Sequence, residues 1–495
     1  MKATRILSLL LAGLIMTSSL VACASGTDDP TDTASTQSTP NTGDDDEIRD
    51  NIPDDLDFGG ETVTFISQYV EGLTSGQITV PDLKSEPIND AIFERNKYVE
   101  NRLNIEIVNI EERVGNYDVI NKVVTAVQSN TGDYDICASP CYAILDQARS
   151  GTFANLADAQ YLDLNQPWWS QGLNDAISYK DAQYTAAGHI FLSTYRFAFS
   201  TVFNKDMFTN ANQKFLYDYV DNGTWTLDKQ ISLLPVFHQD NGNNQQDEQG
   251  DIFGLITGRV FHHDIYFSSC EVEIMTKNED GEYQFVFDSG KLHEVAEKVL
   301  QLYYGTSGAT YICQDENDLR VIFSNGYGAM MTIRLADLES AEMRNMSQSY
   351  GVVPVPRFTE DQDGYYTMLH DAFTSVCIPT TVRGDRLDMV GATLESMASA
   401  GYRIVRPAYY ETTLRSKLAS DPQSAHMMDM IIEGIRIDAG ILHLASIDRF
   451  HHVFRNLMDS NDNTVVSSYR SRAKADEKRV QQLNAKLTAL AEKNK

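Results

Sequence analysis

The chain has 495 residues, and its 40 lysines and arginines against 70 aspartates and glutamates give a formal net charge of −30. Such an acidic surface excludes sequence-independent nucleic-acid binding, which needs basic side chains to contact phosphates. Hydrophobic residues make up 42% of the chain, which excludes a disordered protein and predicts a large core. At roughly 100–200 residues per domain, the length predicts two or three domains.

The N-terminus has the parts of a secretory signal. A positively charged start precedes an apolar run from Ile6 to about Val21, too short and too near the start for a typical transmembrane helix. The run ends in Leu-Val-Ala-Cys at residues 20–23, which resembles the bacterial lipobox. The resemblance implies a signal peptide over residues 1–22 and lipidation of Cys23, which would anchor the protein at the outer face of the cytoplasmic membrane. The alternative is an ordinary signal peptide followed by a chance cysteine.

The next segment, residues 23–56, consists mainly of Ser, Thr, Pro, Gly and Asp. It cannot bury enough apolar surface to offset its conformational entropy, so we predict a flexible acidic stalk. The remaining cysteines are Cys137, Cys141, Cys270, Cys313 and Cys377. Their odd number and scattered positions give no disulfide framework and no second pair for a zinc site, which predicts buried free thiols.

The body begins with strands and helices in alternation. Apolar periodicity predicts them at residues 61–66, 88–103, 105–110, 117–129 and 134–138. This order is typical of a parallel α/β sheet, in which ligands bind beyond the carboxyl ends of the strands. The residues that follow the first and third strands, 67–69 and 139–142, are therefore expected on the ligand side.

Later segments indicate a second lobe. Residues 190–203 form an extended apolar run twice the usual strand length, which could pass from one lobe into another. Thr224 or Thr226 is a plausible N-cap for a helix. Further extended segments are predicted within 323–333 and 350–356, and residues from about 385 onward are mainly helical. The last helix, from Ser468, is predicted to be amphipathic and solvated.

Several of these segments, in their order and spacing, resemble the extracellular solute-binding proteins of ABC importers, family 1, the carbohydrate-type group that includes maltodextrin-binding protein. They are the lipobox with its acidic stalk, Asp-Phe-Gly-Gly at 57–60, Phe-Asn-Lys-Asp at 203–206, Gly-Thr-Trp-Thr at 223–226, and the segments 323–331 and 350–356.

The resemblance implies an α/β, two-lobed periplasmic-binding-protein-like fold of type II, with hinge strands and a helical C-terminal part. It implies a first lobe from residues 57–194 and 334–396, and a second lobe from 195–333 and 397–495. Crossings between the lobes are expected near 193–198, near 330–334, and again past Ile378-Pro379.

A sugar ligand needs aromatic rings for its C–H faces and planar polar groups for its hydroxyls. The candidate ligand-binding residues of these two kinds are Tyr69, Asp135, Tyr142, Trp168, Trp169, Tyr195, Phe197, Arg334, Asp371 and Tyr410. Several have alternative interpretations: the two tryptophans could be packing residues, Arg334 could form a surface ion pair, and Asp135 could cap a helix.

Relatives in the resembled family often carry a calcium loop at the position of residues 240–251. Asp240, Asn244 and Asp251 remain of that pattern, but Gly242 stands at its third position and Gln245 replaces the glycine at its sixth. We therefore predict a polar surface loop without metal, and no cofactor.

The sequence contains no Gly-x-Ser-x-Gly, no His-Glu-x-x-His and no phosphate-binding Gly-rich Lys loop. The predicted function is that of a monomeric, lipid-anchored receptor without enzymatic activity. It would capture a carbohydrate, most simply an oligosaccharide, and deliver it to the permease subunits of an ABC transporter. Two alternatives stay open: a secreted lipoprotein glycoside hydrolase, which needs two carboxylates ~5–10 Å apart, and a surface sugar sensor without transport.

Overall fold

A computed structural model describes residues 49–243, 245–246, 250–415 and 422–493. The predicted signal peptide, Cys23 and the stalk up to residue 48 lie outside the described residues. Among the described helices, none is both long enough and apolar enough to cross a membrane.

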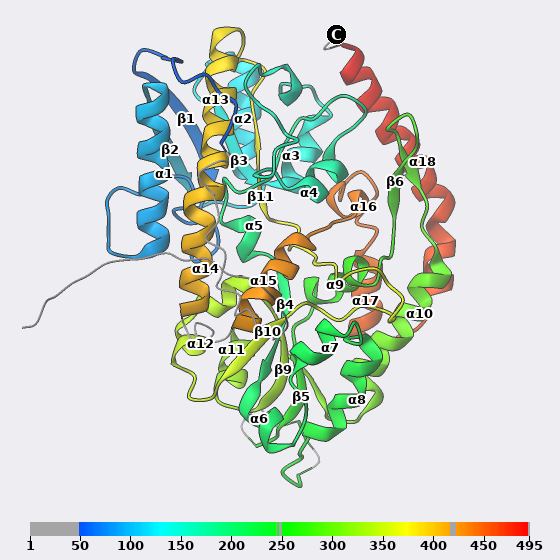
Figure 1. The fold of residues 1–495 in the computed structure, drawn as a ribbon. Coiled ribbons are helices and arrows are strands. Elements are labelled where there is room, and N and C mark those ends of the chain that lie inside the picture. The colour runs from blue at the N-terminus through cyan, green and yellow to red at the C-terminus, as the bar shows by residue number, and fades with distance from the viewer. Residues whose placement is uncertain (1–48, 244, 247–249, 416–421, 494–495) are drawn as a thin grey trace, which may run out of the picture. The chain divides into compact units, whose positions relative to one another are not determined.

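The first lobe is built on a four-stranded sheet in the order β11-β3-β1-β2 (Figure 1). Its strands are β1 (Glu61–Gln68), β2 (Ile105–Glu112), β3 (Ile136–Pro140) and β11 (Thr374–Cys377). The first three are parallel and β11 is antiparallel to β3, which confirms the predicted parallel α/β arrangement. The helices of this lobe are α1 (Pro87–Leu103), α2 (Asp118–Ser129), α3 (Cys141–Ala148), η1 (Leu156–Asp158), α4 (Gln171–Ile177) and α13 (Asp385–Ala400).

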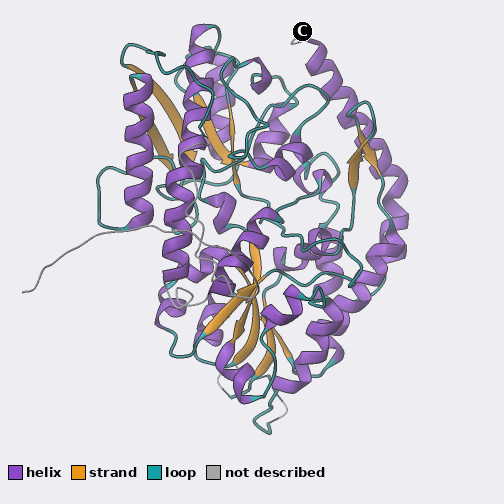
Figure 2. Ribbon diagram, in the orientation of Figure 1, coloured by secondary structure: helices purple, strands orange, loops and turns teal. Residues whose placement is uncertain are grey.

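The second lobe contains a five-stranded sheet in the order β10-β4-β9-β5-β8. Its strands are β4 (Phe199–Asn204), β5 (Phe253–Thr257), β8 (Thr310–Ile312), β9 (Gly328–Arg334) and β10 (Tyr350–Val353). Strand β5 is parallel to β8 and β9, so the carboxyl ends of these three strands meet at one edge. Figure 2 shows helices on both sides of these strands.

The helices of the second lobe include α6 (Lys205–Asn210), α7 (Leu216–Asp221), α8 (Leu227–Phe237), α9 (Phe261–Ser269), α10 (Ser289–Leu300), η2 (Gln301–Gly305), α11 (Glu316–Ser324), η3 (Leu335–Glu339) and α12 (Ala341–Asn345). The Thr226 hydroxyl accepts a hydrogen bond from the backbone N–H of Lys229 (3.2 Å), so the predicted cap of α8 is confirmed. The C-terminal part holds α14 (Arg406–Arg415), α15 (Pro422–Glu433), α16 (Ala439–Leu442), α17 (His452–Asp459) and α18 (Val465–Lys493).

Three segments connect the lobes. The first is the short helix α5 (Ser193–Arg196), and the second is the extended segment 366–373 that leads into β11. The residues just after α5 pair antiparallel with the second segment: the Phe199 N–H donates to Met368 O (3.2 Å) and the His370 N–H donates to Phe197 O (3.0 Å). The third is helical and runs from α13 through η4 (Gly401–Val405) into α14.

The segment 193–198, where a crossing is predicted, begins with a helical turn instead of forming part of one long strand. The crossing predicted near 330–334 is wrong, because β9 is the central strand of the second sheet. Strand β10, within the range 334–396 that was assigned to the first lobe, pairs with β4 and belongs to the second lobe. Its short apolar sequence predicts a strand but carries no information about which sheet it joins.

The predicted stalk also ends earlier than residue 56. Ile52 is buried with the first-lobe core, and the Arg102 guanidinium donates to the Asp50 carboxylate (2.6 Å). One buried apolar side chain and one ion pair thus hold residues 50–52 against α1.

The last helix, α18, is not solvated all round. It buries one face with Val465, Tyr469, Asp476, Val480, Leu483, Leu487 and Leu490. Its far end reaches the first lobe, where the hydroxyls of Tyr179 and Thr488 lie 2.8 Å apart. The hairpin of β6 (Met275–Lys277) and β7 (Tyr283–Phe285) also reaches the first lobe, since the Tyr283 hydroxyl donates to Ala176 O and Ser178 O (3.0 Å each).

The five cysteines of the body are buried, and none forms a disulfide within the described residues, as predicted.

Arg386 of α13 fastens the amino end of β3 to the first lobe. Its guanidinium donates to both carboxylate oxygens of Asp135 (2.8 and 2.7 Å), and that carboxylate is 5% exposed. We predict that Arg386→Ala lowers the free energy of unfolding by about 2 kcal/mol, because a buried carboxylate loses its partner. Chemical denaturation measures this. Lys97→Ala, which removes an exposed ion pair with Glu100, is the control and should change stability by less than ~0.5 kcal/mol.

Candidate functional site

The first lobe presents a polar and aromatic rim beyond the carboxyl ends of β1 and β3. The Gln68 amide, at the end of β1, donates to the side-chain oxygen of Asn116 (2.8 Å). The Asn116 amide donates in turn to the Tyr142 hydroxyl (2.5 Å), and Tyr142 stands in the first turn of α3. The Tyr117 ring packs edge-on against Tyr142 (5.6 Å between centroids).

The second lobe contributes side chains from the carboxyl ends of β5, β8 and β9. Strand β9 ends at Arg334, whose guanidinium pairs with Glu316 at the start of α11 (3.0 Å). The same guanidinium lies 5.4 Å from the ring of Phe261, the first residue of α9. Since β5, β8 and β9 are parallel, these groups come together at the edge of the sheet where ligands bind in open α/β folds.

The segment that returns to the first lobe lies between these two rims. His370 stacks on Phe197 (5.4 Å) and meets the Phe261 ring edge-on (4.3 Å). Asp371 follows, and its carboxylate lies 3.8 Å from the Arg455 guanidinium of α17. Arg455 also binds both oxygens of Asp264, which is completely buried in α9.

Asp371 acts electrostatically on both lobes. Burial, and then the negative charge of Asp371, raise the pKa of Tyr142 in the first lobe to about 12. Burial, and to a smaller extent the negative charge of Asp371, raise the pKa of Asp264 in the second lobe to about 7, although the Arg455 guanidinium acts in the opposite direction. A half-buried carboxylate between two aromatic rims can accept hydrogen bonds from a polar ligand that touches both lobes.

Of the residues predicted from the sequence, Tyr142 lies on the first-lobe rim, Arg334 on the second-lobe rim and Asp371 on the segment between them. Phe197 stacks on His370 beside Asp371. Tyr69 lies at its outer edge, after β1, with the Arg113 guanidinium 3.9 Å from its ring.

The other predicted residues lie elsewhere. Trp168 and Trp169 are buried in the first-lobe core, and their indole N–H groups donate to Glu395 of α13 (3.0 and 2.8 Å). Asp135 precedes β3 instead of ending it, so it lies at the amino edge of the sheet with Arg386. Tyr195 is buried against His189 and Tyr409, and Tyr410 packs on Arg406 beside the third crossing.

The predicted remnant of a calcium loop is described only in part, because Asn244 lies outside the described residues. Asp251 is buried and accepts a hydrogen bond from the Asn241 N–H (2.9 Å). No group of three or more His, Cys, Asp or Glu side chains in the described ranges is arranged to hold a metal ion.

The site also contains Phe261, Asp264, His370 and Arg455, which are not among the residues predicted from the sequence. The sequence gives a local sign of only two of them. Phe261 and Asp264 come shortly after a short apolar strand, β5, that ends just before a glycine, and they therefore lie beyond its carboxyl end. Arg455 lies 84 residues after Asp371 in the sequence, and no local sequence pattern predicts the contact between them.

No protein-family model matches the sequence, and no curated protein is detectably similar to it. Solved structures do match the fold. One is the cyclic alpha-maltosyl-1,6-maltose binding protein from Arthrobacter globiformis, with a TM-score of 0.57, 13% identity, and coverage of 86% of this chain and 99% of that one. Another is an ABC transporter solute binding protein from Thermotoga lettingae bound with alpha-D-tagatose, with a TM-score of 0.52, 15% identity, and coverage of 85% and 100%.

A third is UgpB from Mycobacterium tuberculosis in complex with glycerophosphocholine, with a TM-score of 0.52, 12% identity, and coverage of 87% and 98%. At these identities the likeness concerns the fold. The chain therefore has the two-lobed α/β fold of ABC transporter solute-binding proteins over most of its length.

Because Trp168 and Trp169 are buried in the first-lobe core, we predict that they contribute to stability and not to ligand binding. Trp168→Phe removes an indole donor to Glu395, so we expect the free energy of unfolding to fall by about 1–2 kcal/mol. Ligand affinity should stay within twofold of the unaltered protein, because Trp168 is completely buried in the first-lobe core. Denaturation and titration calorimetry on the same sample test both parts, and a large loss of affinity with little loss of stability would contradict the assignment.

The raised pKa of Glu395 makes the stability of the protein depend on pH. Burial raises its pKa from 4.5 to about 7, although the two indole donors act in the opposite direction. The folded protein therefore holds this proton more tightly than the unfolded chain, so the stabilisation is complete below pH 4.5 and is lost as the pH rises towards 7. Relative to Glu395→Gln, the free energy of unfolding should fall over that window by on the order of 3 kcal/mol. Denaturant titrations of both proteins at several pH values measure the difference.

Proposed function

We propose that the protein is a lipid-anchored substrate-binding receptor of an ABC transporter, which captures a carbohydrate between its lobes and delivers it to the permease. One observation carries the proposal. A single site combines Tyr142 of the first lobe, Asp371 of a crossing segment, and Arg334 and Arg455 of the second lobe. A ligand bound there contacts both lobes at once.

The chemistry of this site supports a carbohydrate as the ligand. Half-buried rings such as Phe261 suit the C–H faces of a sugar, and carboxylate, amide and guanidinium groups suit its hydroxyls. The bound molecules named for structures of the same fold include alpha-D-tagatose. They also include glycerophosphocholine, so the fold alone leaves the ligand class open, and the residues of this chain must decide it.

Capture works through a shift in population between open and closed arrangements of the lobes. A ligand that binds groups on both sides has a higher affinity for the closed arrangement, and closure is favoured by that difference in affinity alone. The paired crossing segments, Phe197–Phe199 and Met368–His370, are the hinge on which this movement takes place.

Delivery to a permease places the receptor outside the cytoplasmic membrane. The lipobox at residues 20–23 supports this location, because a lipid on Cys23 keeps a monomeric receptor close to its transporter. The structures of the same fold are binding proteins, which favours a role without catalysis.

Titration calorimetry with a panel of mono- and oligosaccharides tests the function. We expect at least one sugar to bind with 1:1 stoichiometry and to be recovered chemically unchanged. Release of reducing sugar on incubation would instead establish the glycoside hydrolase.

Asp371→Asn tests the site itself. It keeps the size of the side chain but removes the charge that faces Arg455, so affinity for the bound sugar should fall about 10–100-fold, which corresponds to roughly 1.5–3 kcal/mol for a hydrogen bond to a charged group. Asp82→Asn, on an exposed loop of the first lobe, is the matched control and should leave affinity unchanged. Equal affinity of both variants would remove Asp371 from the site.

A further inference from the structure

The loop before α17 has an unusual backbone. Asp448 and Arg449 are adjacent and both lie in the left-handed region, with φ of 53° and 47°. Such a conformation is unfavourable for a non-glycine residue, and it persists only where the surroundings hold it. The loop leads into α17, since the His452 N–H donates to Arg449 O (3.0 Å).

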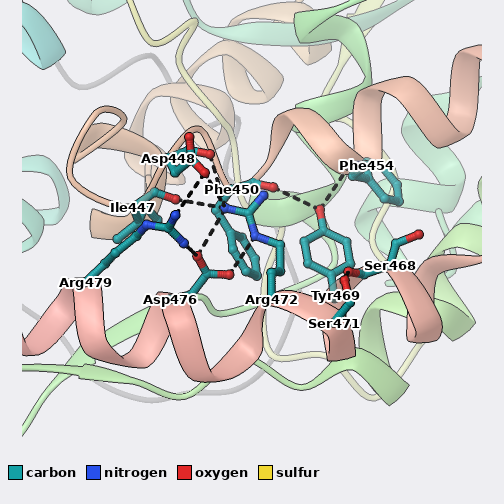
Figure 3. Close-up of polar contacts among 10 residues, drawn as sticks. All are labelled: Ile447, Asp448, Phe450, Phe454, Ser468, Tyr469, Ser471, Arg472, Asp476 and Arg479. Carbon is teal, nitrogen blue, oxygen red and sulfur yellow. Dashed lines mark hydrogen bonds and ion pairs between the residues drawn. The ribbon is translucent and has the colours of Figure 1, made fainter.

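A network on α18 holds this loop (Figure 3). The Arg472 guanidinium donates to the carbonyl oxygens of Ile447 and Asp448 (3.1 Å each). The Asp476 carboxylate, whose side chain is 0% exposed, accepts from Arg472 (2.6 Å) and from Arg479 (2.8 Å). Arg479 also donates to the Asp448 carboxylate (3.1 Å). Asp476 thus fixes Arg472 and Arg479, which hold the left-handed residues Asp448 and Arg449.

A second anchor holds the other side of the loop. The Tyr469 hydroxyl donates to Phe450 O (3.2 Å) and accepts from the Phe454 N–H (3.0 Å), and the rings of Tyr469 and Phe450 are 4.6 Å apart. The backbone at Arg449 is therefore held by hydrogen bonds on both sides.

The loop faces the first-lobe rim of the candidate site. The Ala445 N–H donates to the Asp146 carboxylate, which also accepts from the Tyr117 hydroxyl (2.8 Å). The positive charge of Arg449 acts on the same groups and lowers the pKa values of Tyr117, Tyr142 and Asp146, which burial raises. Arg449 thus lies close to the rim that carries Tyr142.

Arg449 differs from the other arginines of the site. Arg455 is bound to Asp264, and Arg334 is bound to Glu316. The exposed Arg449 guanidinium has no ion pair or side-chain hydrogen bond with any residue in the described part of the chain. In a protein with a net charge of −30, this cation lies near the first-lobe rim without an ion-pair partner among the described residues.

We propose that Arg449 is a specificity-determining residue that binds an acidic group, a carboxylate of the uronate kind, on a saccharide ligand, and that Asp476 is the residue that positions it. A guanidinium matches a carboxylate with two parallel hydrogen bonds, and a fixed backbone reduces the entropy lost when they form. This inference rests on the proposed function, because it concerns the ligand of the same site.

Trigalacturonate and its trimethyl ester are suitable probes, because they differ in carboxylate charge but hardly in shape. Calorimetry should show that the wild-type protein binds the acid at least tenfold more tightly than the ester, with a preference that shrinks at high salt. Arg449→Gln should abolish the preference and leave the affinity for the ester unchanged. Arg470→Gln removes one exposed positive charge from α18 and, as the matched control, should keep the preference.

Asp476→Asn separates positioning from general stability. We expect the preference for the acid to fall at least fivefold while the ester binds as before, and Arg449→Gln/Asp476→Asn should lose no more preference than Arg449→Gln alone. Lys478→Ala, an exposed residue beside Arg479, is the control. A parallel loss of affinity for acid and ester in Asp476→Asn would overturn the positioning role.

The outcomes also separate this inference from the proposed function. If wild type and Arg449→Gln bind the acid and the ester equally well, the recognition of an acidic group is refuted and the sugar receptor stands. If the wild-type protein binds neither these probes nor any sugar of the wider panel, both proposals fall.

Discussion

The antiparallel pairing of two chain segments between the lobes is the constraint on which the site depends. The backbone hydrogen bonds between Phe197–Phe199 and Met368–His370 fix how far apart the two sheets stand and which of their edges face each other. They also place His370 on the Phe197 ring and carry Asp371 between the rims. Together with the helical third crossing, this pairing sets the relation of the carboxyl ends of β1 and β3 to those of β5 and β9.

A second connection between the lobes lies far from this hinge. The hairpin β6–β7 and the end of α18 contact the first lobe through Tyr283, Tyr179 and Thr488, and Lys180 pairs with Glu282 (2.8 Å). The rings of Tyr179 and Tyr283 are buried at this contact, whereas the Lys180–Glu282 pair is partly exposed and contributes little alone. Together these contacts add to the work of separating the lobes. Helix α18, which supplies the Thr488 hydroxyl, also holds the Asp448–Arg449 loop, so it contributes both to the contact between the lobes and to the ligand side.

The charges available at the site depend on which charged side chains are already paired with one another. In a chain of net charge −30, buried carboxylates such as Asp264 are held by arginines, because an unpaired buried charge would be costly. What is left for a ligand is the half-buried Asp371, the neutral hydrogen-bonding groups of Asn116 and Tyr142, and the exposed guanidinium of Arg449. A polar molecule with several hydroxyls and apolar faces complements such a set.

The sequence by itself determined the local elements and their class. Apolar periodicity predicted β1, α1, β2 and α2 to within a few residues, and the alternation of strands and helices predicted a parallel sheet, whose carboxyl ends carry Tyr142. Only the tertiary structure decided that Trp168 and Trp169 bind Glu395 in the core, that β10 joins the second sheet, and that Arg455 reaches Asp371. Periodicity reports which face of an element is apolar, whereas these contacts join residues far apart in the chain and depend on how the elements pack.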